Sequence, residues 1–109
     1  MESFKNINYP FRLTESELNV IESIQIETKT FNRSELIRDL IAFFGNNASR
    51  KDVKRTVLVP MDKKAISISM SFDMQNEIIK LAGKHKIFNN DVLRCAIAYA
   101  KSHNFINNH

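Results

Sequence analysis

Six basic side chains that could bind the phosphates of a nucleic acid are concentrated in one short segment of this 109-residue chain. Residues 48–64 contain "SRKDVKR" and "DKK", whereas acidic side chains outnumber basic ones in residues 1–47. A short basic segment is also typical of a solvated linker, so phosphate contact is one of two interpretations. The side chains concerned are Arg50, Lys51, Lys54, Arg55, Lys63 and Lys64.

The residue types that carry out most enzymatic chemistry are scattered. His85, His103 and His109 lack the spacing of metal ligands, and Cys95 has no histidine or pair of carboxylates near it in the sequence. We expect surface or rim positions for the histidines and a packing role for the thiol. Four acidic residues are expected on the solvated face of a helix: Glu15, Glu17, Glu22 and Glu27. The sequence therefore predicts a protein that is not an enzyme, with no catalytic residue, metal or cofactor.

Length and composition limit the architecture. A chain of 109 residues, 43% of them hydrophobic, suffices for one compact domain but not for two independent cores. A single cysteine excludes an internal disulfide and fits a reducing compartment. The sequence has no signal-peptide pattern and no apolar segment of membrane-spanning length, so we expect a cytoplasmic protein without a membrane partner.

The elements that position the polar residues can be recognised from the spacing of apolar side chains. Every second residue from Ile7 to Leu13 is apolar, which is the period of a strand. From Thr14 onward the spacing is that of a helix, and Thr14 with Glu17 has the pattern of a capping box. A strand is therefore expected to lead directly into a helix that ends near Lys29.

The same pattern recurs 57 residues later, in "KAISISMSF". A second helix follows in each half, and its apolar stripe repeats at a shift of 56: Leu36, Ile37, Leu40, Ile41 and Phe44, then Val92, Leu93, Ala96, Ile97 and Ala100. The dipeptide "FN" before each of these helices favours a shift of 57 instead, so the turn register is open by one residue. The sequence predicts two repeats, residues 6–46 and 64–104, that together form one compact domain. The basic linker at 47–63 contains "TVLVP", which could form either a short strand or an apolar strap.

Capping residues indicate the other helix boundaries. Asn32 or Ser34 is expected to begin the second helix, and Gly45 with Asn46 to end it. In the second repeat, Ser71 or Asp73 is expected to start the first helix and Asn89 or Asn90 the second.

A unit of one strand and two helices cannot bury a core alone, and its strand has an open edge. Two units solve both problems by pairing their strands, which predicts a mainly α fold with a short two-stranded antiparallel β-ribbon. The chain resembles the ribbon-helix-helix family of MetJ/Arc-like DNA-binding proteins in three segments: the alternating strand, "LTESELNVIESI" and "FNRSELIRDLIAFF". Most of that family forms the unit by homodimerisation, so two copies in one chain imply a tandem ribbon-helix-helix protein that is an intramolecular pseudo-dimer.

The resemblance implies that the ribbon enters the major groove, with alternate side chains facing the bases. Arg suits guanine and Asn suits adenine, Ser is promiscuous, and Pro and Ala offer only apolar contact. An exposed polar strand face can also be merely solvated, but a ribbon exposed on two strands has no other evident purpose. The implied base-facing residues are Asn8, Pro10, Arg12, Ala65, Ser67 and Ser69, with Ser71 added if the strand is one pair longer.

The resemblance also implies phosphate contacts at the amino end of the second helix of each repeat, where backbone N–H groups are free. Asp91 would repel a phosphate, so the second repeat is expected to bind it less well. The implied residues are Asn32, Arg33 and Ser34, with Asn89 and Asn90 in the second repeat.

Pro10 predicts the hydrogen-bonding direction within the ribbon. Proline has no N–H, so it fits a strand only where that group would point away from the partner strand. Because this direction alternates along an antiparallel strand, Tyr9 and Phe11 are expected to pair with residues 65–71 of the same chain.

The expected function is therefore sequence-specific binding of double-stranded DNA. Tandem copies in one chain resemble plasmid transfer accessory factors, which bind a transfer origin and assist a relaxase, and this role is slightly favoured. The alternative is a transcriptional repressor that regulates its own plasmid or mobile-element operon. Expected partners are DNA, a relaxase or other relaxosome protein, and further copies of the chain on DNA. A protein-interaction module that does not bind DNA is a third interpretation.

Overall fold

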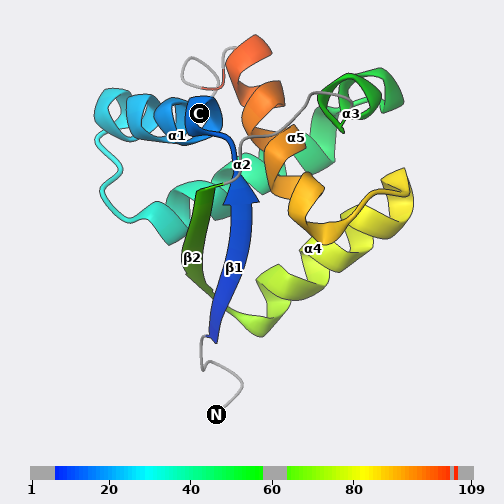
Figure 1. The fold of residues 1–109 in the computed structure, drawn as a ribbon, viewed down its shortest axis with the longest axis horizontal. Coiled ribbons are helices and arrows are strands. Elements are labelled where there is room, and N and C mark those ends of the chain that lie inside the picture. Colours follow the sequence, from blue (N-terminus) through cyan, green and yellow to red (C-terminus); the bar gives the residue numbers. More distant parts are fainter. Residues whose placement is uncertain (1–6, 58–63, 104, 106–109) are drawn as a thin grey trace.

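The computed structural model describes residues 7–57, 64–103 and 105, and this part of the chain is mostly helical (Figure 1). One two-stranded antiparallel sheet is present among these residues. In chain order the elements are β1 (Ile7–Leu13), α1 (Glu15–Thr28), α2 (Arg33–Asn47), α3 (Arg50–Val57), β2 (Lys64–Met70), α4 (Phe72–His85) and α5 (Asn89–Ser102).

The two strands pair within the chain, as the position of Pro10 predicted. Tyr9 faces Ile68 and Phe11 faces Ile66 in the antiparallel register. The backbone N–H and C=O of Arg12 both bond to a side chain on α5, so they point away from β2. Since this direction alternates, Pro10 also faces the open edge, and its missing N–H removes no bond from the ribbon.

Three of the four helices expected from the sequence begin at a predicted capping residue. The Thr14 hydroxyl accepts from the Glu17 N–H at 3.0 Å and a Glu17 carboxylate oxygen accepts from the Thr14 N–H at 2.8 Å, which confirms the capping box. Asn32 caps α2 and Ser71 caps α4. The fourth helix, α5, begins at Asn89, one of its two predicted starting residues, and Phe88 precedes it at the N-cap without a side-chain bond.

The predicted end of α2 at Gly45 and Asn46 is one residue too early, because the helix continues to Asn47. A Cβ atom added to Gly45 would lie 3.3 Å from both methyl carbons of Leu81. This glycine therefore permits α2 to lie close to α4 and does not terminate the helix.

The predicted linker contains a helix, α3, that sequence analysis missed. Asp52 accepts from both the backbone N–H and the hydroxyl of Ser49, which is the hydrogen bonding of a helix start. Val53 is buried, and α3 packs on α5. Thr56 and Val57 end this helix, so the beginning of "TVLVP" is not a strand, while residues 58–60 lie outside the described residues.

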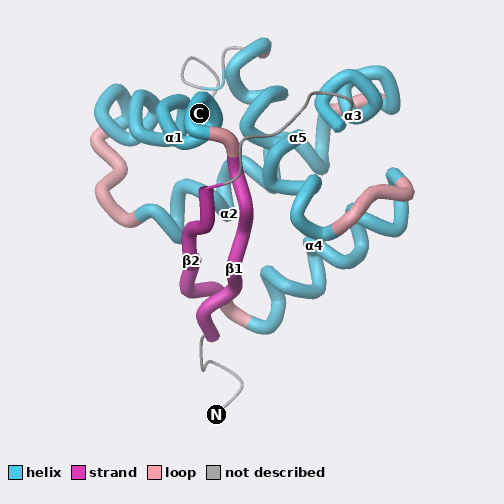
Figure 2. Tube along the Cα trace, viewed as in Figure 1, coloured by secondary structure: helices cyan, strands magenta, loops and turns pink. Residues whose placement is uncertain are grey.

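Buried side chains of both repeats form one hydrophobic cluster. The predicted apolar stripes of α2 and α5 are buried, and these two helices pack against each other behind the ribbon (Figure 2). Phe11 and Leu13 of β1, with Ile68 and Met70 of β2, close the cluster from the ribbon side. The ribbon is therefore anchored on the α2–α5 pair by one of its two faces.

The repeat in the sequence is also present in the arrangement of elements. β2 and α4 begin and end 57 residues after β1 and α1, and α5 begins 56 residues after α2. Pro10 faces Ser67, the residue that corresponds to it at the same shift. This register is the one that a local two-fold axis between Pro10 and Ser67 would produce.

Candidate nucleic-acid interface

One face of the ribbon is exposed along its whole length. The side chains of Asn8, Pro10 and Arg12 on β1 are exposed, and so are those of the residues that face them on β2. The six side chains predicted to face bases thus lie on one surface, in three cross-strand pairs: Asn8 with Ser69, Pro10 with Ser67, and Arg12 with Ala65.

The other face fixes which side chains are exposed. A shift of one residue in the pairing would turn the inward side chains of one strand outward, either Phe11 and Leu13 of β1 or Ile68 of β2, and all three are now buried. The cost of exposing them locks the register, so the position of Arg12 and its neighbours on the open face is well determined.

Ser71 is not part of this face. β2 ends at Met70, so the optional longer strand is absent, and the Ser71 hydroxyl accepts from the Met74 N–H at 3.2 Å. Ser71 therefore caps α4 and does not extend the ribbon.

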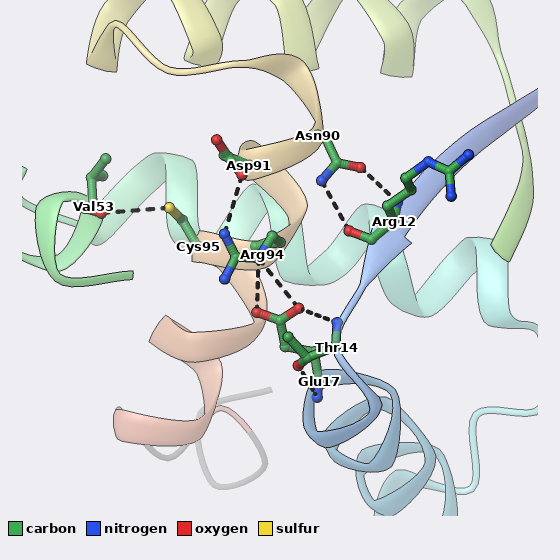
Figure 3. A network of polar contacts seen from close by, with 8 residues as sticks. All are labelled: Arg12, Thr14, Glu17, Val53, Asn90, Asp91, Arg94 and Cys95. Atoms are coloured by element: carbon green, nitrogen blue, oxygen red, sulfur yellow. Dashed lines mark hydrogen bonds and ion pairs between the residues drawn. The ribbon is translucent and has the colours of Figure 1, made fainter. Parts of the chain in front are cut away.

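The Arg12 end of the ribbon is held by α5, as Figure 3 shows. The Arg12 N–H donates to Asn90 Oδ1 at 2.7 Å, and Asn90 Nδ2 donates to the Arg12 carbonyl at 2.9 Å. Next to it, Asn89 Nδ2 donates to the Tyr9 hydroxyl at 3.3 Å. Asn89 and Asn90, predicted to contact phosphate, are thus engaged with β1.

Arg94, which sequence analysis missed, lies at the centre of a buried charge cluster (Figure 3). Its Nε is 3.1 Å from Glu17 Oε2 and its Nη1 is 3.3 Å from Asp91 Oδ1. Glu17 was expected on a solvated helix face, and that expectation is wrong because this carboxylate joins the start of α1 to α5. The Asp91–Arg94 spacing of three was the only local signal for the cluster.

The other end of the ribbon has different residues at the corresponding positions. Met74 corresponds to Glu17 and Arg38 to Arg94, and Ser34 corresponds to Asn90. Arg38 is exposed and has no hydrogen bond or ion pair with any residue that the structure describes. An open pocket lies here, lined by Asn32, Ser34, Glu35, Arg38, Ser69, Met70, Ser71 and Met74.

Two of the three predicted phosphate contacts of the first repeat, Asn32 and Ser34, line this pocket. Asn32 caps α2 through its side chain, while Arg33 and Ser34 are half-buried in the first turn. Free backbone N–H groups at a helix start favour an anion. Both helix starts carry such groups: the Asn32 side chain accepts from one of them, the Glu35 N–H, whereas no side chain caps α5, where the side chains of Asn89 and Asn90 bond to β1 instead.

The first part of the basic segment, residues 50–55, lies on α3, away from the ribbon in Figure 1, whereas Lys64 is the first residue of β2. Arg50, Lys51 and Lys54 are exposed around the buried Val53. Lys63 and the side chains of Arg55 and Lys64 lie outside what the structure describes.

The cysteine and histidine side chains considered for chemistry can be placed where the structure describes them. Cys95 is buried with its sulfur 3.9 Å from the Val53 carbonyl, which confirms the packing role. His85 is half-buried against the Phe44 ring, and burial, followed by the positive charges of Lys84 and Arg50, lowers its pKa. His109 lies outside the described residues. Within the described ranges, no group of three or more His, Cys, Asp or Glu side chains is arranged to hold a metal ion.

None of the described helices combines the length and apolar character needed to cross a membrane. Comparison of the chain with models of known protein families, with curated proteins and with solved structures finds no match.

Proposed function

We propose that this chain is a sequence-specific double-stranded DNA-binding protein that inserts its β-ribbon into the major groove. The observation that carries the proposal is the anchored ribbon, whose outer face presents six short or flexible side chains in three cross-strand pairs. The major groove is about 12 Å wide and admits a two-stranded ribbon. Arg12 can bond guanine O6 and N7, Asn8 can bond adenine N6 and N7, and the serines can bond either.

We also propose that the chain is a tandem ribbon-helix-helix protein and an intramolecular pseudo-dimer. Support comes from the repeated element order and from the Pro10–Ser67 pair at the ribbon centre. The pseudo-dimer would place the first turns of α2 and α5 on the two phosphate strands that flank the groove. Both first turns carry an acidic residue, Glu35 in α2 and Asp91 in α5, and α2 would be the stronger phosphate contact because Arg33 also lies in its first turn.

The biological role that we propose is binding a plasmid transfer origin as a relaxosome accessory factor, with a relaxase as partner. A single-chain pseudo-dimer supports this role because its two strands differ and can read two different half-sites without a second chain. Repression of its own operon uses the same DNA-binding face and remains the alternative. Locating the preferred sequence at a transfer origin or at a promoter separates the two roles.

Selection of bound duplexes from a random pool tests the DNA-binding proposal. We expect an enriched motif that is not a palindrome, because Arg12 and Asn8 have no counterparts of the same type on β2. Binding should weaken steeply with salt as counterions are released. A protein-interaction module would instead enrich no motif and show no loss of DNA binding with salt.

The basic side chains of α3 provide a separate prediction. Replacing Arg50, Lys51 and Lys54 with glutamine should weaken binding to every duplex and flatten the log–log salt dependence by about 0.9 per lost phosphate contact. The measurement is the dissociation constant at several salt concentrations. A control with Lys80, Lys84 and Lys101 replaced by glutamine removes the same charge elsewhere and should keep the original slope. Equal slopes for both variants would make α3 an ordinary solvated surface.

A further inference from the structure

The side-chain amide of Asn90 forms two hydrogen bonds with the backbone of Arg12, at the open edge of β1. It accepts from the Arg12 N–H at 2.7 Å and donates to the Arg12 carbonyl at 2.9 Å, although the residues lie 78 positions apart. These backbone groups have no partner strand on that side, so without Asn90 they would form hydrogen bonds only with water. The one residue on β1 that carries a guanidinium is therefore the one that α5 holds by its backbone.

Asn90 is itself fixed by the helix on which it lies. Arg94 is one turn further along α5 and is bound to Glu17, whose other oxygen accepts from the Thr14 N–H. Thr14 follows Arg12 by two residues, so α5 holds the chain on Arg12 itself and again just after it. This double attachment restricts both the position and the direction of the Arg12 Cα–Cβ bond.

In the part of the chain that the structure describes, the other end of the ribbon lacks both the backbone hydrogen bonds of Asn90 and the ion pair of Arg94. Ser34 and Ser69 correspond to Asn90 and Arg12, and no hydrogen bond joins these two serines. Met74 replaces Glu17, so the ion pair has no counterpart there either, within the described residues. Among the described residues, the pair of hydrogen bonds from Asn90 is thus found only at the ribbon end that carries the long side chain of Arg12.

We infer that Asn90 is a positioning residue that sets the Arg12 side chain for base reading and so contributes to sequence discrimination. The inference rests on the proposed DNA-binding function. Bidentate contact with guanine requires a guanidinium in one plane, and an arginine on a loose edge strand would lose more conformational freedom on binding. Holding the backbone in advance reduces that loss for the matching sequence, whereas random DNA makes no bidentate contact that could benefit.

The test compares Asn90→Ala and Asn90→Ser with the unchanged protein on the selected duplex and on a random duplex. We expect each variant to weaken binding to the selected duplex about fivefold to tenfold, as the ordering of one long side chain on binding implies, and binding to random DNA less than twofold. Asn90→Ser introduces the residue type of Ser34, which occupies the corresponding position of α2. If Asn90→Ala does not fold, Asn90→Ser still allows the two duplexes to be compared. Asn46→Ala, an exposed amide near the end of α2, is the matched control and should change neither affinity.

A double-mutant cycle distinguishes positioning from a general structural role. In an Arg12→Ala background, Asn90→Ser should have no further effect on the selected duplex, because the side chain that it positions is gone. Equal loss on both duplexes, or an additive loss in that background, would overturn the inference and leave DNA binding intact. If Arg12→Ala itself does not reduce discrimination, the base-reading role of Arg12 fails, and the inference fails with it.

Discussion

Replacing Arg94 with alanine is expected to lower the free energy of unfolding by about 3–5 kcal/mol. Only 3% of the Arg94 surface is exposed, and the carboxylates of Glu17 and Asp91 both face its guanidinium. Without the cation, two poorly solvated negative charges remain next to each other at the junction of α1 and α5. The measurement is equilibrium unfolding in urea, with the slope used to check that both proteins unfold in one cooperative step.

Arg38→Ala is the matched control for this prediction, because Arg38 occupies the corresponding position of α2 but is exposed. Its effect should stay within about 0.5 kcal/mol, as for most surface substitutions. The double variant Glu17→Met with Arg94→Leu should be less destabilised than Arg94→Ala, because it removes the charge pair together and leaves a methionine like Met74. Similar losses for Arg94→Ala and Arg38→Ala would contradict the buried cluster.

Replacing Arg12 with alanine is expected to reduce binding to the selected duplex by about 1–3 kcal/mol and binding to random DNA only slightly. Arg12 is exposed on the ribbon face, so its removal should leave the unfolding free energy nearly unchanged. Fluorescence anisotropy with the two labelled duplexes, at one salt concentration, gives both dissociation constants.

Arg12→Lys sharpens the interpretation, since lysine keeps the charge but cannot form the planar bidentate contact. If Arg12 reads a guanine, Arg12→Lys should lose most of the discrimination that Arg12→Ala loses. If Arg12 instead binds a phosphate, Arg12→Ala should weaken both duplexes equally and Arg12→Lys should restore them.

Local signals in the sequence were sufficient for much of the fold. The change from strand period to helix period at Thr14 and its recurrence 57 residues later predicted both strands, and Pro10 predicted their pairing. The caps at Asn32 and Ser71 were among the predicted candidates because N-capping depends on residues within one turn. The start of α3 had a comparable signal in Ser49 and Asp52, and it was obscured by the charge of the segment.

The contacts around the candidate site could not be predicted in the same way. Asn90 and Arg94 act on Arg12 and Glu17, which lie nearly 80 positions earlier in the chain. No period or spacing encodes such a pair, and an Asn at a helix start resembles a cap equally well. These contacts follow only once the strands pair and α5 lies next to the beginning of α1.

Titration of the isotope-labelled protein with its selected duplex, followed by the backbone amide signals, tests the central claim most directly. We predict that the largest shifts fall on Arg12, Ser67 and Ser69 of the ribbon, and on the first turn of α2. Signals from the middle of α4 should hardly change. Shifts confined to helix surfaces, with the ribbon signals unchanged on saturation with DNA, would contradict insertion of the ribbon into the groove.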